Sequence, residues 1–507
     1  MHHHGLGTWM AKRRLKSPEK TALIYGDGER LTYRELADLA DAASTMLSRR
    51  GIRKGDPVAY LGENSPEFLT VLFGAAQIGA VFVPVNTRLA PPEVAHVLSD
   101  SGARMLIHDA DFAERLVPVI AETQIDHVIQ TGAGDHSHPG LAAVLAQIQV
   151  DDVRIVNDVD DPAAIIYTSG TTGKPKGAVL THDNLTWVSM NCIVDYDVVS
   201  SDVALMISPL FHVASLGMGA LPVILKGATL VLEKGFDPGR ALAQIERNGI
   251  TMLSGVPTTY QLMADHPNWA STDISTLAKL TCGGSAVPTR ILDAFEQRGL
   301  SFSQGYGMTE TSPGATSLSP AKTREKQGSV GLPHFFTEVR IADASGAIVG
   351  QGTVGEIEIA GPNVFSGYHG LPEATAAAFS TDGWFRSGDL GYLDDEGYLY
   401  IADRLKDMII SGSENIYPAE IENHLYSIDG VTGAAVIGVP DDKWGEVPLA
   451  ILTVRKDASI DTASVRRHLE SKLARYKLPK NVVFVTELPR TASGKVRKAD
   501  LRAQYAT

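Results

Sequence analysis

The sequence predicts an α/β protein whose large N-terminal domain combines parallel α/β sheets with a small β-barrel, followed by a smaller α+β C-terminal domain. Three observations support this fold class. The 507 residues exceed what one hydrophobic core usually holds. Strand and helix patterns alternate through the opening hundred residues, and the pattern changes character after about residue 328. We expect the N-terminal domain over residues 1–403 and the C-terminal domain over residues 404–507.

The opening residues give the parallel-sheet prediction its detail. Thr32 precedes an apolar run and Glu35 lies three residues later, a capping box that should start a helix. A buried strand is expected at 58–61, an apolar helix at 67–78 and another strand at 80–85. Strands that alternate with helices in this way favour a parallel sheet.

The later segments complete the N-terminal domain. Residues 134–160 are loop-rich and acidic, and should form a surface connection. The α/β rhythm resumes in short apolar runs that end at Leu230 and lie at 250–253 and 277–281. Short strands then alternate with glycines, which is typical of a small β-barrel; they are expected at 338–341, 355–359 and 398–401. After Arg404, charged residues and short elements indicate a compact α+β domain of about 100 residues.

Composition narrows the class of protein. The chain is 44% apolar and 21% charged, as in ordinary globular proteins. Cys192 and Cys282 lie far apart and match no metal spacing, which favours a reducing cytoplasm over a disulfide framework. The sequence contains no long uncharged apolar run, so it predicts no membrane-spanning helix. Peripheral contact with a membrane is compatible with this composition. The histidines at 2–4 are expected to be native or a tag remnant rather than metal ligands.

The segment from Tyr167 to Gly177 carries the strongest chemical signal. It reads Tyr-Thr-Ser-Gly-Thr-Thr-Gly-Lys-Pro-Lys-Gly, so backbone N–H groups, hydroxyls and ammonium groups can all donate to phosphate oxygens. It is not a Walker A loop, because Lys174 is followed by Pro175 instead of opening a helix. The alternative is a solvated linker. Apolar strands on both sides, at 163–167 and 178–180, disfavour that alternative.

The charge distribution agrees with an anionic small-molecule ligand. The net charge is −14, but the part from Arg404 onward has 16 Lys/Arg and 13 Asp/Glu, a net +3, which leaves −17 for the rest. An acidic body argues against nucleic acid as a partner. A slightly basic C-terminal domain suits closure over phosphates.

Six further segments accompany the phosphate loop: Ser208-Pro209-Leu210-Phe211-His212, Cys282-Gly283-Gly284-Ser285-Ala286, Gly305-Tyr306-Gly307-Met308-Thr309-Glu310, Trp384-Phe385-Arg386-Ser387-Gly388-Asp389, Asp403-Arg404-Leu405-Lys406-Asp407 and Leu488-Pro489-Arg490-Thr491-Ala492-Ser493-Gly494-Lys495. Together with the loop, they resemble the signatures of the adenylate-forming enzymes. That superfamily comprises acyl-CoA synthetases, peptide-synthetase adenylation domains and firefly luciferase. The resemblance spans nearly the whole chain.

The resemblance implies a nucleotide site. Tyr306 would stack on adenine, Asp389 would accept both ribose hydroxyls, and Arg404 would be the second ribose ligand. A surface ion-pair cluster around Arg404 is the simpler alternative. The nucleotide-binding residues implied in this way are Thr168, Ser169, Gly170, Thr171, Thr172, Gly173, Lys174, Lys176, Gly284, Ser285, Gly305, Tyr306, Gly307, Thr309, Asp389 and Arg404.

The resemblance also implies the catalytic and metal residues. Lys495 would meet the substrate carboxylate and the α-phosphate, where negative charge develops. Glu310 and Thr168 would hold Mg²⁺, which prefers hard oxygen ligands. His212 would border the acyl tunnel as a gate rather than a base, although a satisfied core histidine is an equal alternative. Thr309 and Glu310 could otherwise simply cap a helix.

The implied acyl pocket consists of small and apolar residues. No arginine accompanies them, so a second carboxylate on the substrate is disfavoured. The expected lining residues are His212, Val213, Gly255, Gly283, Gly307, Pro313 and Gly314.

The last implied features belong to the C-terminal domain. Lys406 matches the hinge about which this domain would swing, and the coenzyme A tunnel would be flanked by Ser411, Gly412, Ser413 and Glu414. The family commonly has Gly-Gly-Glu-Asn where this chain has Ser411-Gly412-Ser413-Glu414-Asn415. The added Ser413 hydroxyl could slow the second half-reaction.

The resemblance therefore implies an ATP-dependent acyl-CoA synthetase that needs ATP, Mg²⁺ and coenzyme A. It would form acyl-AMP and pyrophosphate, and then acyl-CoA and AMP. The overall pattern is most similar to bacterial fatty-acyl-CoA synthetases and to feruloyl or 4-coumaroyl-CoA synthetases, so we expect a fatty acid as substrate, with the aryl acids as the alternative. A luciferase-type oxygenase and a module that feeds a carrier protein are further alternatives. We expect a cytoplasmic enzyme, either homodimer or monomer.

Overall fold

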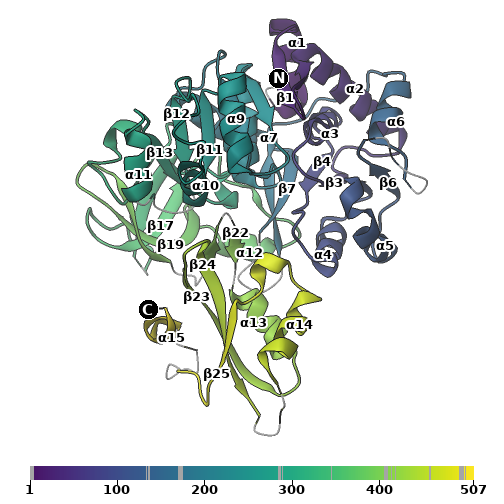
Figure 1. The fold of residues 1–507 in the computed structure, drawn as a ribbon. Helices are drawn as coiled ribbons and strands as arrows, with labels where there is room; N and C mark the ends of the chain where they lie inside the picture. Colours follow the sequence, from purple (N-terminus) through teal and green to yellow (C-terminus); the bar gives the residue numbers. More distant parts are fainter. Residues whose placement is uncertain are drawn as a thin grey trace. The chain divides into compact units, whose positions relative to one another are not determined.

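The computed structural model describes residues 5–132, 134, 138–168, 175–283, 287, 289–343, 345–404, 409–412, 414–416, 418–455, 458, 460–489, 496 and 498–506 (Figure 1). The chain forms two compact units. The first contains residues 1–87, 98–166 and 177–402. The second contains 88–97, 167–176 and 403–507. The division at Asp403–Arg404 that we expect from the sequence stays a prediction.

One sheet of the first unit has the strand order β18-β8-β7-β4-β3-β5-β6. Strand β3 pairs in parallel with β4 and with β5, and β7 joins β4 in parallel, whereas β18 joins β8 antiparallel. The buried β3 and β4 confirm the strands predicted at 58–61 and 80–85. The bounds are β3 Pro57–Leu61, β4 Val81–Pro84, β5 Met105–His108, β6 His127–Gln130, β7 Pro162–Thr168, β8 Lys176–Thr181 and β18 Gly367–Tyr368.

The other sheet has thirteen strands among the described residues, in the order β16-β17-β19-β20-β15-β14-β13-β12-β11-β9-β10-β1-β2. Strands β13 to β1 in this order pair in parallel, and the other pairs among the described residues of this sheet are antiparallel where their register is defined. The short glycine-separated strands that we expect after residue 328 are present, and they form the antiparallel end of this sheet. The bounds are β1 Thr21–Tyr25, β2 Glu29–Thr32, β9 Val203–Met206, β10 Thr229–Leu232, β11 Met252–Gly255, β12 Lys279–Cys282, β13 Phe302–Tyr306, β14 Thr316–Leu318, β15 Ser329–Pro333, β16 Glu338–Ala342, β17 Gly355–Ala360, β19 Phe385–Leu393 and β20 Leu399–Arg404.

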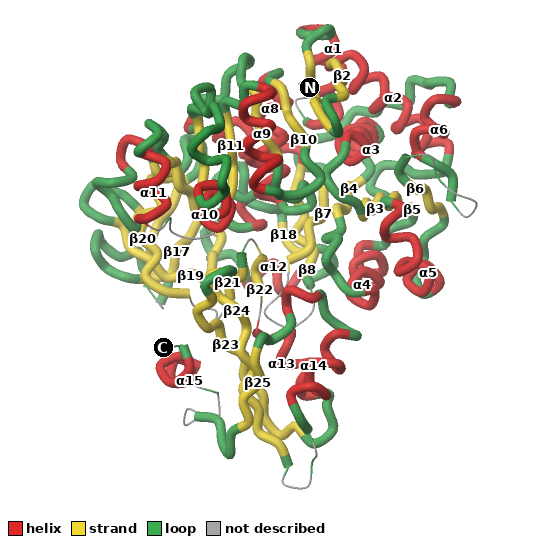
Figure 2. Tube along the Cα trace, viewed as in Figure 1, coloured by secondary structure: helices red, strands yellow, loops and turns green. Residues whose placement is uncertain are grey.

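Helices cover these sheets, as Figure 2 shows. Helices α9, α10 and α11 pack through one apolar cluster on strands β9, β11, β12 and β13. A larger cluster includes α1, α2, α3, α7 and α8 together with residues of both sheets. The bounds are α1 Trp9–Lys16, α2 Tyr33–Arg49, α3 Pro66–Gln77, α4 Pro91–Ser101, α5 Ala113–Ala121, α6 Leu141–Gln147, α7 His182–Asp195, α8 Leu221–Lys226, α9 Pro238–Asn248, α10 Pro257–Ala264, α11 Thr289–Glu296 and α12 Pro372–Ala377.

Local sequence signals explain several of these helices. The Thr32 side chain accepts a hydrogen bond from the Glu35 amide, and the Glu35 carboxylate accepts one from the Thr32 amide. The predicted capping box is therefore confirmed. Helix α3 confirms the helix predicted at 67–78 and begins after the Ser65 cap, with Pro66 in its first turn. The segment 134–160 is less irregular than expected, because its apolar residues 141–147 form α6.

The second unit contains a small α+β core of its own. Strands β23 and β24 form a long antiparallel pair, β25 joins β24 in parallel, and β21 joins it antiparallel. Two apolar clusters lie within this unit, one including residues of α13 and α14 and the other including α15. The bounds are β21 Ile409–Ser411, β22 Glu414–Ile416, β23 Val431–Asp441, β24 Gly445–Val454, β25 Asn481–Phe484, α13 Pro418–Tyr426, α14 Thr462–Glu470 and α15 Lys498–Tyr505. The predicted C-terminal α+β fold is confirmed.

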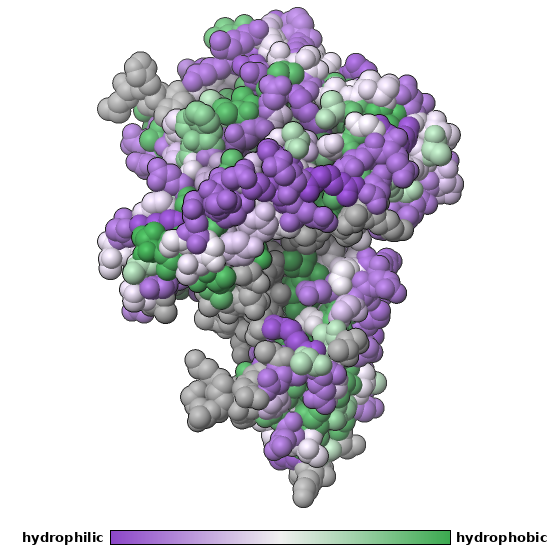
Figure 3. All heavy atoms as spheres, turned by 90° about the vertical axis from the view of Figure 1, so that its left-hand side faces the viewer, coloured by the Kyte–Doolittle hydropathy of each residue, from purple (hydrophilic) through white to green (hydrophobic). Residues whose placement is uncertain are grey.

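On the face shown in Figure 3, hydrophilic residues cover much of the first unit and hydrophobic residues form smaller groups. Over the described residues, no helix combines the length and the apolar character that crossing a bilayer requires.

Candidate active site

The carboxyl ends of three parallel strands meet where the sequence predicts the nucleotide and acyl sites. Gly255 of β11 lies opposite Cys282 of β12, which in turn lies opposite Gln304 of β13. The Gly283 amide, just beyond β12, donates to the Gly255 carbonyl at 3.3 Å. Ligands of α/β proteins bind at this edge of a parallel sheet. Among the described residues, a Cβ at Gly283 would meet only the Gly305 carbonyl oxygen, at 3.9 Å, which would leave room for a flat ligand.

Tyr306 and Asp389 come together although 83 residues separate them. The Tyr306 hydroxyl donates to Asp389 Oδ2 at 2.8 Å. Tyr306 ends β13, and Asp389 lies in β19 directly after Gly388, whose φ of 73° a side chain would strain. The Ser387 hydroxyl accepts from the Asp389 amide at 3.1 Å. The structure thus joins the predicted adenine platform to the predicted ribose ligand.

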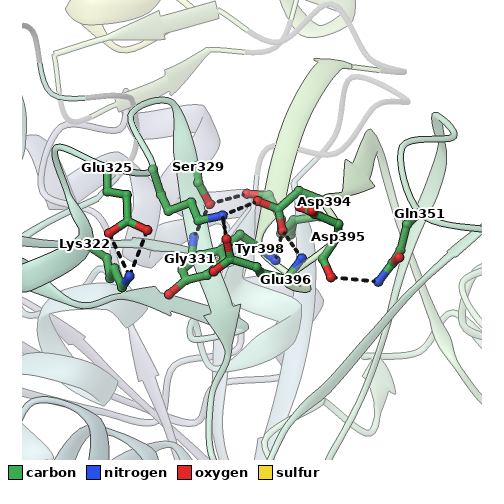
Figure 4. A network of polar contacts seen from close by, with 11 residues as sticks. Lys322, Glu325, Ser329, Gly331, Gln351, Asp394, Asp395, Glu396 and Tyr398 are labelled. Carbon is green, nitrogen blue, oxygen red and sulfur yellow. Dashed lines mark hydrogen bonds and ion pairs between the residues drawn. The ribbon is translucent and has the colours of Figure 1, made fainter.

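An ion-pair network supports the hairpin between β19 and β20 (Figure 4). Lys326 donates to Glu396 Oε1 at 2.8 Å and to Asp394 Oδ2 at 2.9 Å. Hydrogen bonds to these two carboxylates raise the pKa of the Lys326 amine. Asp394 Oδ1 also accepts from the Tyr398 amide at 2.9 Å, which closes the turn. Because β19 carries Asp389, this network helps to fix the strand that presents the carboxylate.

Glu310 is held by a tyrosine that the sequence did not single out. The Tyr368 hydroxyl donates to Glu310 Oε1 at 2.8 Å, and the Phe365 amide donates to the Glu310 carbonyl at 2.8 Å. Tyr368 lies in the two-residue strand β18, which pairs with β8 at Ala178. Glu310 is therefore tied to the strand that follows the phosphate loop. Thr309 and Glu310 form a short 3₁₀ turn rather than the start of a longer helix.

The described ends of the phosphate loop lie in the second unit. The Thr168 hydroxyl, at the end of β7, makes a long 3.5 Å contact to the Lys176 carbonyl at the start of β8. His96 Nε2 lies 3.2 Å from the Pro175 carbonyl, and its ring meets Tyr167 edge to face. Other predicted site residues lie outside the described residues: Ser169, Gly170, Thr171, Thr172, Gly173, Lys174, Gly284, Ser285, Lys406, Ser413 and Lys495. Of Arg404 only the backbone, the end of β20, is described.

The predicted coenzyme A segment is a tight turn between β21 and β22. The Gly412 amide donates to the Trp444 carbonyl at 2.7 Å, and the φ of Gly412 is 62°. Glu414 is 3% exposed and forms an ion pair with Arg88 inside the second unit. Ser411 is buried in the sheet beside Gly445.

The segment that carries His212 is held by a buried asparagine. Asn64 accepts from the Leu210 amide at 2.7 Å and donates to the Ser208 carbonyl at 2.9 Å. His212 is half-buried and packs against Phe211, with ring centroids 4.6 Å apart. Ala214–Ala220 then forms a π-helical turn, a feature that often marks functional sites.

The residues 307–314 fold back tightly against this turn. A Cβ at Gly307 would overlap the Pro313 carbonyl oxygen, and a Cβ at Gly217 would overlap the Ser312 carbonyl oxygen. Ser312 adopts a left-handed φ of 64°, a strained conformation that tends to occur at functional sites. Buried Asn363 holds the segment by donating to the carbonyls of Thr311 at 3.0 Å and Gly314 at 2.6 Å.

A buried histidine that the sequence did not single out lies next to Gly314. The His334 ring pairs through Nδ1 with Asp195 Oδ2, and its side chain is fully buried. A Cβ at Gly314 would lie 3.1 Å from His334 Nε2 and 3.5 Å from the Met218 sulfur. Nε2 itself has no hydrogen-bond partner among the described residues. Nothing local in Pro333-His334-Phe335 distinguishes this histidine, and Asp195 is 139 residues away.

Comparison with known proteins agrees with this geometry. Residues 10–369 match the AMP-binding enzyme family, and residues 420–495 match the AMP-binding enzyme C-terminal domain. The chain is 47% identical over 505 residues to a feruloyl-CoA synthase from an Amycolatopsis species, covering 100% of both chains. It is 38% identical over 500 residues to the long-chain-fatty-acid–CoA ligase FadD13 from Mycobacterium tuberculosis, covering 98% of both.

A solved structure shows the same fold. The o-succinylbenzoate CoA synthetase MenE from Bacillus subtilis, a double mutant bound to a product analogue, matches with a TM-score of 0.89 and 33% identity, covering 98% of both chains. These matches cover most of the chain, and they include both domains of the family. The chain therefore belongs to the AMP-binding, adenylate-forming enzymes and is an AMP-forming acid–CoA ligase.

Proposed function

We propose that this ligase activates a hydroxylated cinnamic acid, such as ferulic or 4-coumaric acid. The observation that carries the proposal is the 47% identity to feruloyl-CoA synthases over the complete length, against 38% to the fatty-acid ligase. The sequence alone favours fatty acids, with the aryl acids as the alternative. The comparisons favour that alternative.

The nucleotide is held at the carboxyl ends of β11, β12 and β13. Tyr306 supports the adenine, and Asp389 accepts the ribose hydroxyls while the Tyr306 hydroxyl fixes its carboxylate at 2.8 Å. The phosphate loop wraps the triphosphate with its N–H groups, hydroxyls and ammonium groups. Adenylation then depends mainly on positioning and on charge stabilisation.

Mg²⁺ fits the donor set at Glu310. The Tyr368 hydroxyl orients this carboxylate, and a magnesium site needs only one or two carboxylates beside the phosphate oxygens. Thr168 is the second residue that would hold the ion. When bound, the ion neutralises charge on the phosphates as the acid attacks.

The two half-reactions use the second unit differently. Lys495 meets the carboxylate and the α-phosphate during adenylation. Rotation about Lys406 then withdraws Lys495 and presents the turn at 411–414 for coenzyme A. A domain swing that completes one active site at a time is a hinge mechanism.

A substrate panel tests the proposal. Pyrophosphate release and acyl-CoA formation are measured with ferulate, 4-hydroxycinnamate, benzoate, octanoate and palmitate at saturating ATP and coenzyme A. We expect kcat/KM to be highest for the two hydroxycinnamates. A higher kcat/KM for octanoate or palmitate would show that the enzyme is a fatty-acid ligase.

A further inference from the structure

Among the described residues, an unpartnered ring nitrogen of His334 borders the predicted acyl pocket, and the tautomer of the ring follows from the partner of its other nitrogen. Asp195 Oδ2 also accepts from the Phe335 amide, at 3.3 Å, and faces His334 Nδ1. A carboxylate accepts hydrogen bonds, so Nδ1 carries the ring proton. In a neutral imidazole that carries its proton on Nδ1, Nε2 presents a lone pair.

The surroundings of Nε2 offer it no donor among the described residues. A Cβ at Gly314 would lie within 3.5 Å of both Nε2 and the Met218 sulfur, and the Tyr196 ring lies edge to face against the imidazole with ring centroids 5.8 Å apart. A buried acceptor without a partner costs about 1–3 kcal/mol. A fatty acyl chain has no hydrogen-bond donor and would leave this cost in place.

The position of His334 is fixed from several sides. Its amide donates to the Ala315 carbonyl at 3.0 Å. The following residues are held by Asn191, which accepts from the Phe336 amide at 2.9 Å and donates to the Thr337 hydroxyl at 3.0 Å. Thr337 in turn donates to Asn363, the residue that holds the Gly314 carbonyl. One buried network therefore fixes the histidine and the pocket segment together.

We infer that His334 Nε2 accepts a hydrogen bond from the phenolic hydroxyl of the acid, and that Asp195 positions His334 by holding its proton on Nδ1. This inference rests on the proposed function and names the residue that recognises the hydroxyl. No covalent step is involved. His334 is a specificity residue that contacts the substrate, and Asp195 is a positioning residue.

The test compares acids that differ at one group: 4-hydroxycinnamate, 4-methoxycinnamate and cinnamate. In the unaltered enzyme we expect kcat/KM for the hydroxy acid to exceed that for cinnamate by roughly 10–100-fold, because binding of cinnamate leaves Nε2 unpaired. The methoxy acid, which cannot donate, should be used no better than cinnamate. A preference for the methoxy acid over the hydroxy acid overturns the inference.

Two variants assign the effect to the pair. His334→Leu should bring the hydroxy-to-cinnamate ratio of kcat/KM to within about threefold of one, because the larger loss falls on the hydroxy acid. Asp195→Asn can reverse the proton position and should lower the same ratio with the imidazole still present; it carries the test if His334→Leu does not fold. An unchanged ratio in both variants, or equal losses for both acids, overturns the inference.

His182→Leu is the matched control. His182 is another fully buried histidine, at the opposite end of helix α7, and neither of its ring nitrogens has a partner among the described residues. This variant should leave the ratio of the two acids unchanged. If the unaltered enzyme uses octanoate but uses neither 4-hydroxycinnamate nor cinnamate, the proposed function fails together with the inference. If it uses 4-hydroxycinnamate and cinnamate equally, only the inference fails.

Discussion

Replacing Tyr306 with phenylalanine tests the contact between the proposed adenine platform and the proposed ribose ligand. The variant keeps the ring and removes the hydroxyl that donates to Asp389 Oδ2 at 2.8 Å. The bond is present without ligand, so its removal affects ATP binding mainly through the cost of ordering the Asp389 side chain, about 0.5–1.5 kcal/mol. Since about 1.4 kcal/mol corresponds to a factor of ten, the Kd for ATP should rise by roughly 2- to 10-fold. Acyl-AMP carries the same adenosine, so the KM for supplied acyl-AMP in thioester formation should rise as well.

The assay is calorimetric titration with ATP, supported by the KM for ATP in pyrophosphate release. Tyr33→Phe is the matched control, because the buried Tyr33 hydroxyl donates to the Ala228 carbonyl at 2.6 Å, away from the proposed site residues. That variant should lose stability and keep its affinity for ATP. A double-mutant cycle between Tyr306→Phe and Asp389→Ala should show coupling of about 1 kcal/mol or more. Coupling near zero, or an unchanged Kd in Tyr306→Phe, would refute the reasoning.

Three further predictions concern the second unit. Lys495→Ala should abolish acid-dependent ATP–pyrophosphate exchange while thioester formation from supplied acyl-AMP survives; equal loss of both would remove Lys495 from the adenylation step. Lys406→Pro should spare adenylation and impair thioester formation, and an unaltered second step would contradict the hinge assignment. Burial and the neighbouring Glu93 raise the pKa of Glu420 to about 7 against the attraction of Lys477. The resulting stabilisation is complete below pH 4.5 and is lost as pH rises toward 7. Protection factors in β23 and β24, which correct the exchange rates for the intrinsic pH dependence of amide exchange, should therefore be larger at pH 5 than at pH 8. Glu420→Gln should flatten this dependence, and an equal slope in that variant would refute it.

The sequence predicted elements well where the signal is local. Capping at Thr32, the strands on either side of the phosphate loop and the short strands after residue 328 all depend on neighbouring residues, and the structure confirms them. The local pattern does not indicate the helix at 141–147, because its short apolar run lies among polar residues.

Side-chain contacts between residues far apart in the chain cannot be predicted from these local patterns. The motifs suggested that Tyr306 and Asp389 share a ligand, but only the pairing of strands shows that their side chains touch. Tyr368 and Asn363 act through positions that the fold alone brings to Glu310 and Gly314. The pair of Asp195 and His334 spans 139 residues and carries no motif, so its existence depends on where helix α7 ends.

The length of α7 has a consequence for engineering this enzyme. The helix begins one residue after the strand that leaves the phosphate loop and ends on the aspartate that orients His334. Its fourteen residues act as a rigid spacer of about 21 Å. Inserting or deleting one residue would turn Asp195 by about 100° around the axis, away from the imidazole. Variation of acid preference should therefore come from exchanged side chains in this region, and insertions within the spacer should be poorly tolerated.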